Sequence, residues 1–195
     1  MNMDSDIEII RAFVKETLTE SGAHGLDHTF RVTRLSETIG IQEGADMRVL
    51  IPAALLHDIA RPLEEKTGKP HEIEGARIAE EFLLPMGFPE DLIGPVVDAI
   101  RTHRFRSEKK PSTLEAQILS DADKLDAMGA IGIARAFLTA GERGGDMVDA
   151  MDHIKEKLLN LQVLMYTGTA RKMAESRHMI LQTFLATLCE EMQTE

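Results

Sequence analysis

The chain has 195 residues, of which 43% are hydrophobic and 28% charged, an ordinary composition for one soluble globular domain with its own core. Its formal net charge of −11 argues against a nucleic-acid polymer as partner, because phosphate backbones require a basic surface. A nucleotide stays open, because a metal and a few local Lys or Arg can hold its phosphates. Aromatic residues make up only 4% of the chain, so a core of aliphatic residues and Met is expected, which favours helices over sheets.

The same survey predicts a cytoplasmic protein. The single cysteine, Cys189, rules out an intramolecular disulfide and fits a reducing compartment. We find no apolar run of about 18 residues and no signal-peptide pattern, so we expect no membrane partner. The oligomeric state stays open, and a homodimer is compatible with the sequence.

Apolar residues recur at helical spacing along nearly the whole chain, and no alternating strand pattern extends beyond a few residues. We therefore predict an all-α bundle of roughly seven or eight helices. Gly40 is expected to end the second helix, and Arg61-Pro62 to end the third, with a surface loop following to Pro70. Glycines are expected to interrupt the long helix. The predicted helices cover roughly residues 5–18, 27–40, 46–59, 72–84, 89–102, 113–140, 147–165 and 170–192.

The third predicted helix raises a question, because its apolar run VLIPAALL leads directly into His57 and Asp58. His57 continues the apolar face, three and four residues after Ala54 and Ala53. A buried His or Asp is costly unless it is hydrogen-bonded, paired or bound to a metal. These two residues therefore need partners from elsewhere in the chain.

Two further polar residues fall on inward faces. His28 lies in the first turn of the second helix, and Asp123 follows Leu119 by one helical turn. Together with His57 and Asp58 they offer two nitrogens and two carboxylates, a set that suits octahedral Mn, Fe, Co, Ni or Mg and, less strictly, Zn. Helix bundles build metal sites from facing helices in this way. On spacing alone, hydrogen-bonded core histidines and solvated or capping aspartates explain the same residues equally well.

The segments DHTFRV, LLHDIA and DADKLDA resemble the HD-domain phosphohydrolase superfamily. In that family a His, a later His-Asp doublet and a distal Asp hold a divalent metal in an all-helical domain. The match falls on His28, His57-Asp58 and Asp123. Asp121 is the competing carboxylate, but the family pattern places the ligand on the Asp before Lys-Leu. Asp121 then stays a candidate for a hydrogen bond to a ligand.

The resemblance also extends toward the C-terminus. GAIGIARAF and LLNLQVLMYTGTARKMAESRH resemble a subgroup of small bacterial and archaeal HD hydrolases. We therefore expect a single HD domain over residues 1–195, with the motifs in a core of about 21–140 and C-terminal helices of about 146–192 packing on it.

The resemblance implies a metal-dependent phosphohydrolase that cleaves a phosphate ester or anhydride of a nucleotide or similar small molecule. Asp58 is the natural bridge between the metal and the attacking water. Arg61 and Lys124 are expected to reach the bound phosphate. The alternative for each is a solvated surface charge, which explains Arg61 equally well. Some family members carry a catalytic carboxylate three residues after the doublet. This chain has Arg61 there, so the proton donor to the leaving group is unassigned.

Two more histidines are candidates for that donor. The resemblance to HD proteins with extra histidines between the doublet and the last Asp implies that His71 and His103 line the site, as proton donors, phosphate ligands or ligands of a second metal. The alternative is that His71 caps a helix and His103 is a cation at a helix C-terminus. His24 is a weaker candidate. Two other functions stay open: a phosphodiesterase for a cyclic or linear dinucleotide, and a non-catalytic nucleotide sensor.

Overall fold

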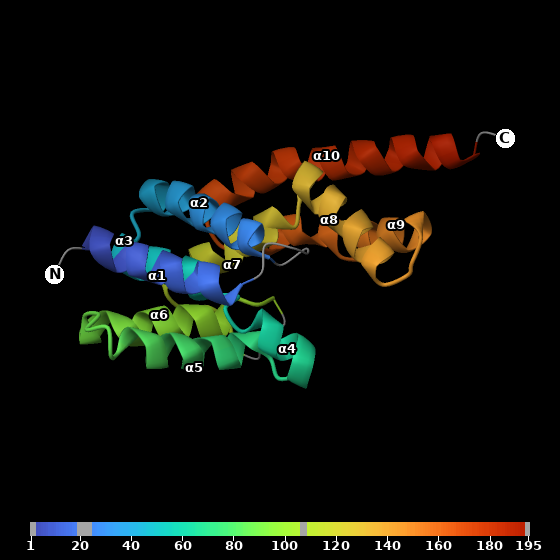
Figure 1. Cartoon of the computed structure of the whole chain (residues 1–195). Coiled ribbons are helices and arrows are strands. Elements are labelled where there is room, and N and C mark those ends of the chain that lie inside the picture. The colour runs from blue at the N-terminus through green and yellow to red at the C-terminus, as the bar shows by residue number, and fades with distance from the viewer. Residues whose placement is uncertain (1–2, 19–24, 106–108, 194–195) are drawn as a thin grey trace. The chain divides into compact units, whose positions relative to one another are not determined.

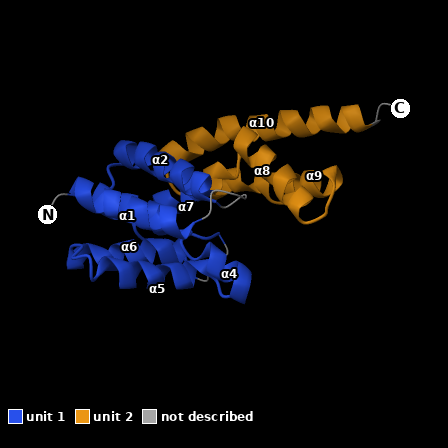
Figure 2. Cartoon of the chain, in the orientation of Figure 1, with its two compact units in different colours: residues 1–123 blue, residues 124–195 orange. Residues whose placement is uncertain are grey.

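The computed structural model describes residues 3–18, 25–105 and 109–193. Within these ranges the chain forms ten α-helices and one 3-10 helix, with no strand (Figure 1). The predicted all-α class is confirmed. The chain divides into two compact units, residues 1–123 and 124–195, which are coloured separately in Figure 2. The expectation that the C-terminal helices pack on the motif-bearing core stays a prediction. His24 lies outside the described residues.

The first unit is built around its most apolar helix, α3. This helix carries one charged residue, Arg48, and seven of its ten residues are buried. A helix that is apolar all round belongs in a core. Helices α1, α2 and α6 all pack against it, and α5 pairs with α6 (Figure 1). The helices of this unit are α1 (Met3–Thr17), α2 (Leu26–Glu43), α3 (Met47–Leu56), α4 (Arg61–Thr67), α5 (His71–Leu83), α6 (Glu90–Thr102) and α7 (Leu114–Asp126), the last of which runs across the boundary at residue 123.

Gly40 does not end the second helix, contrary to the sequence prediction, because α2 continues to Glu43. Its role is close packing. A Cβ atom added at Gly40 would lie 2.5 Å from Leu50 Cδ2 and 2.9 Å from Met47 Sδ, closer than real side chains approach. The glycine therefore lets α2 lie directly against α3.

The segment after Arg61 is also different from the prediction. Instead of a surface loop to Pro70, residues Arg61–Thr67 form the helix α4, with Pro62 in its first turn. A proline there costs nothing, because the first backbone N–H groups of a helix have no intrahelical partner and the fixed φ of proline suits the helix. Arg61-Pro62 thus begins a helix rather than ending one, and Glu64 has a defined position within that helix.

The second unit contains α8 (Gly129–Glu142), α9 (Met147–Glu156), a 3-10 helix η1 (Leu158–Leu164) and α10 (Gly168–Gln193). The single long helix expected over 113–140 is divided into α7 and α8, and the helix expected over 147–165 is divided into α9 and η1. The first break falls at Gly129, whose φ of +66° lies in the left-handed region that residues with a Cβ rarely adopt. These divisions and α4 explain why the described residues form more helices than the seven or eight expected.

Within the described part of the chain, none of the helices is both long and apolar enough to cross a membrane.

Candidate metal centre

The His57-Asp58 doublet lies where α3 ends. His57 is the C-cap residue of α3, Asp58 follows in a turn, and both side chains are fully buried. The Nδ1 atom of His57 lies 2.8 Å from the backbone oxygen of Ala54. A carbonyl oxygen can only accept, so Nδ1–H is the donor, and the other ring nitrogen faces the interior.

Burial also decides the charge of His57. Removal from water lowers the pKa of its imidazole to about 4, and the nearby Asp58 carboxylate only partly opposes this effect. The ring is therefore neutral at pH 7. With the proton on Nδ1, the Nε2 atom carries a lone pair and is free to act as a metal ligand.

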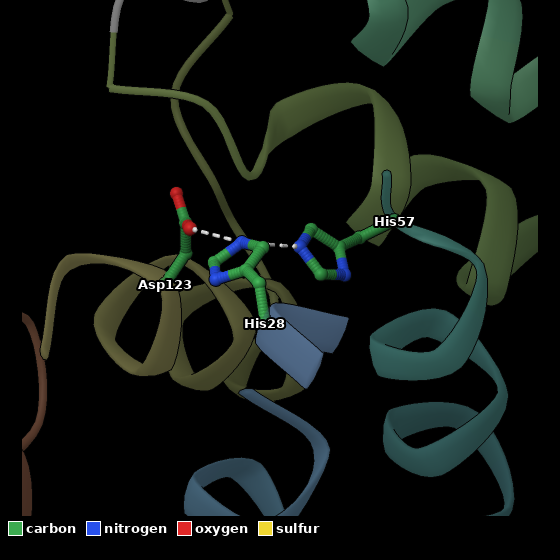
Figure 3. A group of neighbouring side chains, drawn as sticks. All are labelled: His28, His57 and Asp123. Carbon is green, nitrogen blue, oxygen red and sulfur yellow. Dashed lines mark hydrogen bonds and ion pairs between the residues drawn. The ribbon is translucent and has the colours of Figure 1, made fainter. Parts of the chain in front are cut away.

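His28 and Asp123 complete the group around this nitrogen. His28 is the third residue of α2, and its Nε2 lies 3.4 Å from His57 Nε2 and 3.4 Å from Asp123 Oδ1 (Figure 3). Asp123 lies near the end of α7, with a quarter of its side chain exposed. Among the described residues, the group of ligand-type atoms at this place includes Asp123 but not Asp121, although Asp121 is the more buried of the two.

The Asp123 carboxylate is ionised in this setting. Burial works against its charge, but the hydrogen bond from His28 and the field of the neighbouring imidazoles hold the pKa of Asp123 well below its usual value. The group therefore combines a negative carboxylate with at least one neutral imidazole.

Asp58 connects this group with a second one. Its Oδ2 atom lies 3.4 Å from His28 Nε2 and 3.7 Å from His57 Nε2. Its Oδ1 atom lies 3.3 Å from His71 Nε2 and 3.8 Å from His103 Nε2. Each carboxylate oxygen thus faces a different pair of histidines.

His71 and His103 reach Asp58 from two helix ends. His71 is the first residue of α5 and His103 is the C-cap residue of α6, and both are buried. The Nδ1–H of His103 donates to the Ile100 carbonyl oxygen at 2.6 Å, while the backbone oxygen of His103 accepts from Ser120 Oγ at 2.8 Å. The second contact joins the end of α6 to α7. The helix ends predicted for both histidines are observed, and the structure places both rings beside Asp58.

Glu64 is a residue of this region that the sequence did not reveal. Its Oε2 atom lies 2.8 Å from His71 Nδ1, so the ring donates through Nδ1–H. Burial lowers the pKa of His71 to about 4, which leaves Nε2 with a lone pair at neutral pH. Burial opposes the charge of Glu64, yet contact with His71 and the charge of Arg61 keep the pKa of this carboxyl below its usual value. The sequence shows only that a carboxylate lies seven residues before His71. Because that carboxylate falls in a predicted surface loop, no contact with His71 is expected from the sequence.

The two predicted phosphate-binding cations lie in different surroundings. Arg61 Nε donates to Asp58 Oδ1 at 3.0 Å, and its NH1 donates to Glu64 Oε2 at 3.0 Å. Lys124 is 5% exposed, and its Nζ lies 4.7 Å from the centre of the Tyr166 ring, a cation–π contact within the second unit. The phosphate-binding role of both residues stays a prediction.

The four residues predicted as ligands fit a divalent ion. Ligands of a tetrahedral ion with bonds of about 2.1 Å lie about 3.4 Å apart, and adjacent octahedral ligands about 3.0 Å apart. The contacts of His28 Nε2 to His57, Asp58 and Asp123 are each 3.4 Å. A lone pair on His57 Nε2 facing another imidazole nitrogen and two carboxylates is unfavourable in a buried site unless a cation lies between them.

Comparison with known proteins finds similarity to one family. The family model described as the HD domain matches residues 25–128. YpgQ of Bacillus subtilis strain 168 is 36% identical over 190 residues, which cover 93% of this chain and 91% of YpgQ. The crystal structure of YpgQ in complex with ADP has a TM-score of 0.80, with 33% identity and coverage of 96% of this chain and 98% of that chain.

Two other relatives differ in how much of their length is matched. The crystal structure of a predicted HD superfamily hydrolase from an uncultured Thermotogales bacterium has a TM-score of 0.73 and 35% identity, with 98% of this chain and 99% of that chain covered. Ribonuclease Y of Mycoplasma mycoides is 33% identical over 126 residues, which are 64% of this chain but only 27% of the ribonuclease. The family match over more than half of the chain, together with the full-length similarity to YpgQ, shows that this chain belongs to the HD domain family.

Proposed function

We propose that this protein is a metal-dependent phosphohydrolase that acts on a nucleotide or a similar small phosphorylated molecule. The observation that supports this function most directly is the convergence of His28, His57, Asp58 and Asp123 on one buried spot, with contacts of 3.4–3.7 Å between their ligand atoms. Their nitrogen and oxygen atoms suit a divalent ion such as Mn²⁺, Mg²⁺, Fe²⁺, Co²⁺, Ni²⁺ or Zn²⁺.

When bound, such an ion polarises a phosphoryl oxygen and makes a bound water more acidic. The protein's own groups have to place that water. Asp58 suits this role because its Oδ2 faces His28 and His57 while its Oδ1 faces His71 and His103. A carboxylate in this position can bind the ion through one oxygen and accept a hydrogen bond from the attacking water through the other.

His71 and His103 are the proposed partners of the leaving group. Their Nε2 atoms lie within 3.8 Å of Asp58 Oδ1, and their Nδ1 atoms are held by Glu64 and by the Ile100 carbonyl. A ring fixed through Nδ1 can present Nε2 to a phosphate oxygen or move a proton through it. Lys124 remains a proposed phosphate contact, since it directly follows Asp123 in α7.

A nucleotide is the favoured substrate for two reasons. The crystal structure of YpgQ was obtained with ADP, and YpgQ matches nearly the whole of this chain. The net charge of −11 disfavours a polymeric nucleic acid, which needs an extended basic surface. The partial identity with Ribonuclease Y favours, as a second candidate, cleavage of a phosphodiester bond in a small substrate such as a cyclic or linear dinucleotide.

The test is hydrolysis by the purified, Mn²⁺-loaded protein. We expect release of phosphate or pyrophosphate from at least one nucleoside mono-, di- or triphosphate, or of a nucleoside monophosphate or a linearised product from a dinucleotide, and chelation by EDTA to stop the reaction. The variant Asp58→Asn keeps the shape of the side chain but loses its charge, and we expect it to lose roughly 10²–10³-fold of turnover, the size of loss seen when a transition-state contact is removed.

The matched control is Asp98→Asn, the same chemical change at a residue whose side chain is 30% exposed and contacts Lys109 on the surface. This variant should keep wild-type turnover. Hydrolysis at the wild-type rate by Asp58→Asn would contradict the role proposed for Asp58. Tight nucleotide binding without hydrolysis of any panel member would instead identify a nucleotide sensor.

A further inference from the structure

The two oxygens of Asp58 lie in unequal surroundings. Oδ2 faces the two imidazole nitrogens of the proposed metal site. Oδ1 is contacted by the Arg61 guanidinium, whose Nε donates to it at 3.0 Å, and by His71 Nε2 at 3.3 Å. The Oδ1 side therefore already holds a fixed positive charge, supplied by the protein itself.

Without that charge, the Oδ1 side would have the donors of a second cation site. His71 and His103 both direct Nε2 toward Oδ1, and both rings are oriented through hydrogen bonds at Nδ1. His71 Nε2 is buried, and no hydrogen bond satisfies it among the described residues. One carboxylate oxygen and two imidazole nitrogens are a common ligand set for a divalent transition metal. Two ions joined by one carboxylate typically lie about 3.5–4 Å apart.

Arg61 is held firmly at this place. Its NH1 donates to Glu64 Oε2 at 3.0 Å, and only 18% of its side chain is exposed. Glu64 is in turn fixed by His71 and by Arg104, whose NH1 donates to Glu64 Oε1 at 3.0 Å. Because the guanidinium donates to both Asp58 and Glu64, its displacement would break two charged hydrogen bonds. At 3.0 Å from Asp58 Oδ1, its positive charge repels a divalent cation that would bind the same oxygen.

We propose that Arg61, held by Glu64, occupies the position of a second divalent ion at Asp58 Oδ1, so that the cluster binds one ion on the Oδ2 side. The inference rests on the proposed metal-dependent function and adds the stoichiometry of its site. His71 and His103 then keep Nε2 for the substrate, since no second ion takes up these nitrogens.

The experiment counts bound Mn²⁺ after equilibrium dialysis, by elemental analysis and by electron paramagnetic resonance. We expect the wild type to hold about one ion per chain with the six-line spectrum of an isolated Mn²⁺, and Arg61→Ala to hold about two with the broadened spectrum of a coupled pair. Arg61→Gln serves as a second neutral variant in case Arg61→Ala folds poorly, and should also hold about two. The double variant Arg61→Ala, His71→Ala should return to about one, because a ligand of the second ion is missing.

Two controls separate charge from structure. Arg61→Lys keeps a positive charge near Asp58 and should hold about one ion. Arg104→Gln removes the contacts to Glu64 and Glu72 but leaves the Arg61–Asp58 pair in place, and should also hold about one. Two ions in the wild type, or one ion in both neutral Arg61 variants, would overturn the inference while leaving hydrolysis by the protein intact. No ion in the wild type would overturn the inference together with the metal assignment on which it rests.

Discussion

Both units of this protein bury charged or polar side chains, but the two do so in opposite ways. In the first unit His57 Nε2 points at His28 Nε2 across 3.4 Å, and two carboxylates lie beside them. In the second unit the Arg135 guanidinium meets the Asp126 carboxylate at 2.6 Å. The first arrangement gathers four side chains of metal-ligand type around one point, whereas the second joins one donor directly to one acceptor.

Two other arginines of the second unit, Arg171 and Arg177, also donate directly to acceptors. Arg171 donates to the backbone oxygens of Met165 and Tyr166 at 3.1 and 2.8 Å, which ties α10 to the segment that precedes it. Arg177 donates to the backbone oxygen of Leu125. These contacts complete hydrogen bonds that helix ends would otherwise lack.

The difference separates a binding site from a structural contact. Buried polar groups are normally satisfied by one another, so a cluster whose lone pairs face a common point is costly without a bound cation. In the second unit the buried Asp126 carboxylate is matched directly by the Arg135 guanidinium. In the first unit the Arg61 guanidinium donates to one oxygen of Asp58, within a cluster of four histidines and two aspartates.

The largest predicted effect is a loss of turnover when His71 or His103 of the first unit is replaced. If His71 and His103 present Nε2 to the substrate, replacement of at least one by Gln should lower turnover roughly 10²–10⁴-fold. Metal content at the proposed site should not change, because both rings face Asp58 Oδ1 while the proposed ion binds on the Oδ2 side. Steady-state kinetics and elemental analysis of His71→Gln and His103→Gln measure both quantities.

Thermal unfolding of the same variants provides the control. If the two histidines only cap helices, their replacement should cost on the order of 1 kcal/mol of stability and leave turnover unchanged. Wild-type turnover in both variants would therefore assign these histidines to helix capping.

Acid should reveal the buried neutral histidines in metal-free protein. The pKa of His57 is about 4 in the folded state and near 6.5 when the chain is unfolded. Between these values only the unfolded chain takes up the proton, so the free energy of unfolding should fall as the pH is lowered from 6.5 to 4. A shift of this size corresponds to about 3 kcal/mol for His57.

Urea unfolding of EDTA-treated protein across this pH range measures that loss. His57→Gln has no proton to take up at this position, so its stability should depend less steeply on pH than that of the wild type. Equal slopes for the two proteins would mean that His57 is not buried in a neutral state.

A substitution in the second unit should lower stability without changing metal content or turnover. Arg135→Met removes the guanidinium that faces Asp126, and breaking a buried ion pair in this way costs about 3 kcal/mol of stability. Under conditions in which the variant is fully folded, its metal content and turnover should stay at the wild-type level. Loss of Mn²⁺ from folded Arg135→Met protein would show that the polar contacts of the second unit also support the metal site.

The sequence allowed the main features of the site to be predicted. Helical periodicity indicates the all-α fold, and the position of His57 at the end of an apolar helix indicates its burial. The helix ends at His71 and His103 were also visible in the pattern. These features depend on residues within one helical turn of one another, which a sequence displays directly.

The contacts of Arg61 and Glu64 could not be predicted in the same way. They depend on α4, a helix of seven residues whose first turn contains Pro62, and the proline was interpreted as a helix end. The pairing of Glu64 with His71 also requires α4 and α5 to pack at a defined angle. Short helices and long-range side-chain pairs are set by tertiary packing, which local periodicity does not encode.

The central claim, that the buried cluster of the first unit is a metal site, is tested most directly by metal analysis. Wild-type protein and the variant His57→Ala, Asp58→Ala would be loaded with Mn²⁺, dialysed and analysed for bound metal, with circular dichroism to verify that both are folded. We predict about one ion per chain in the wild type and nearly none in the variant, because two of the four ligand side chains are removed. The wild-type amount of metal in the folded variant would contradict the claim.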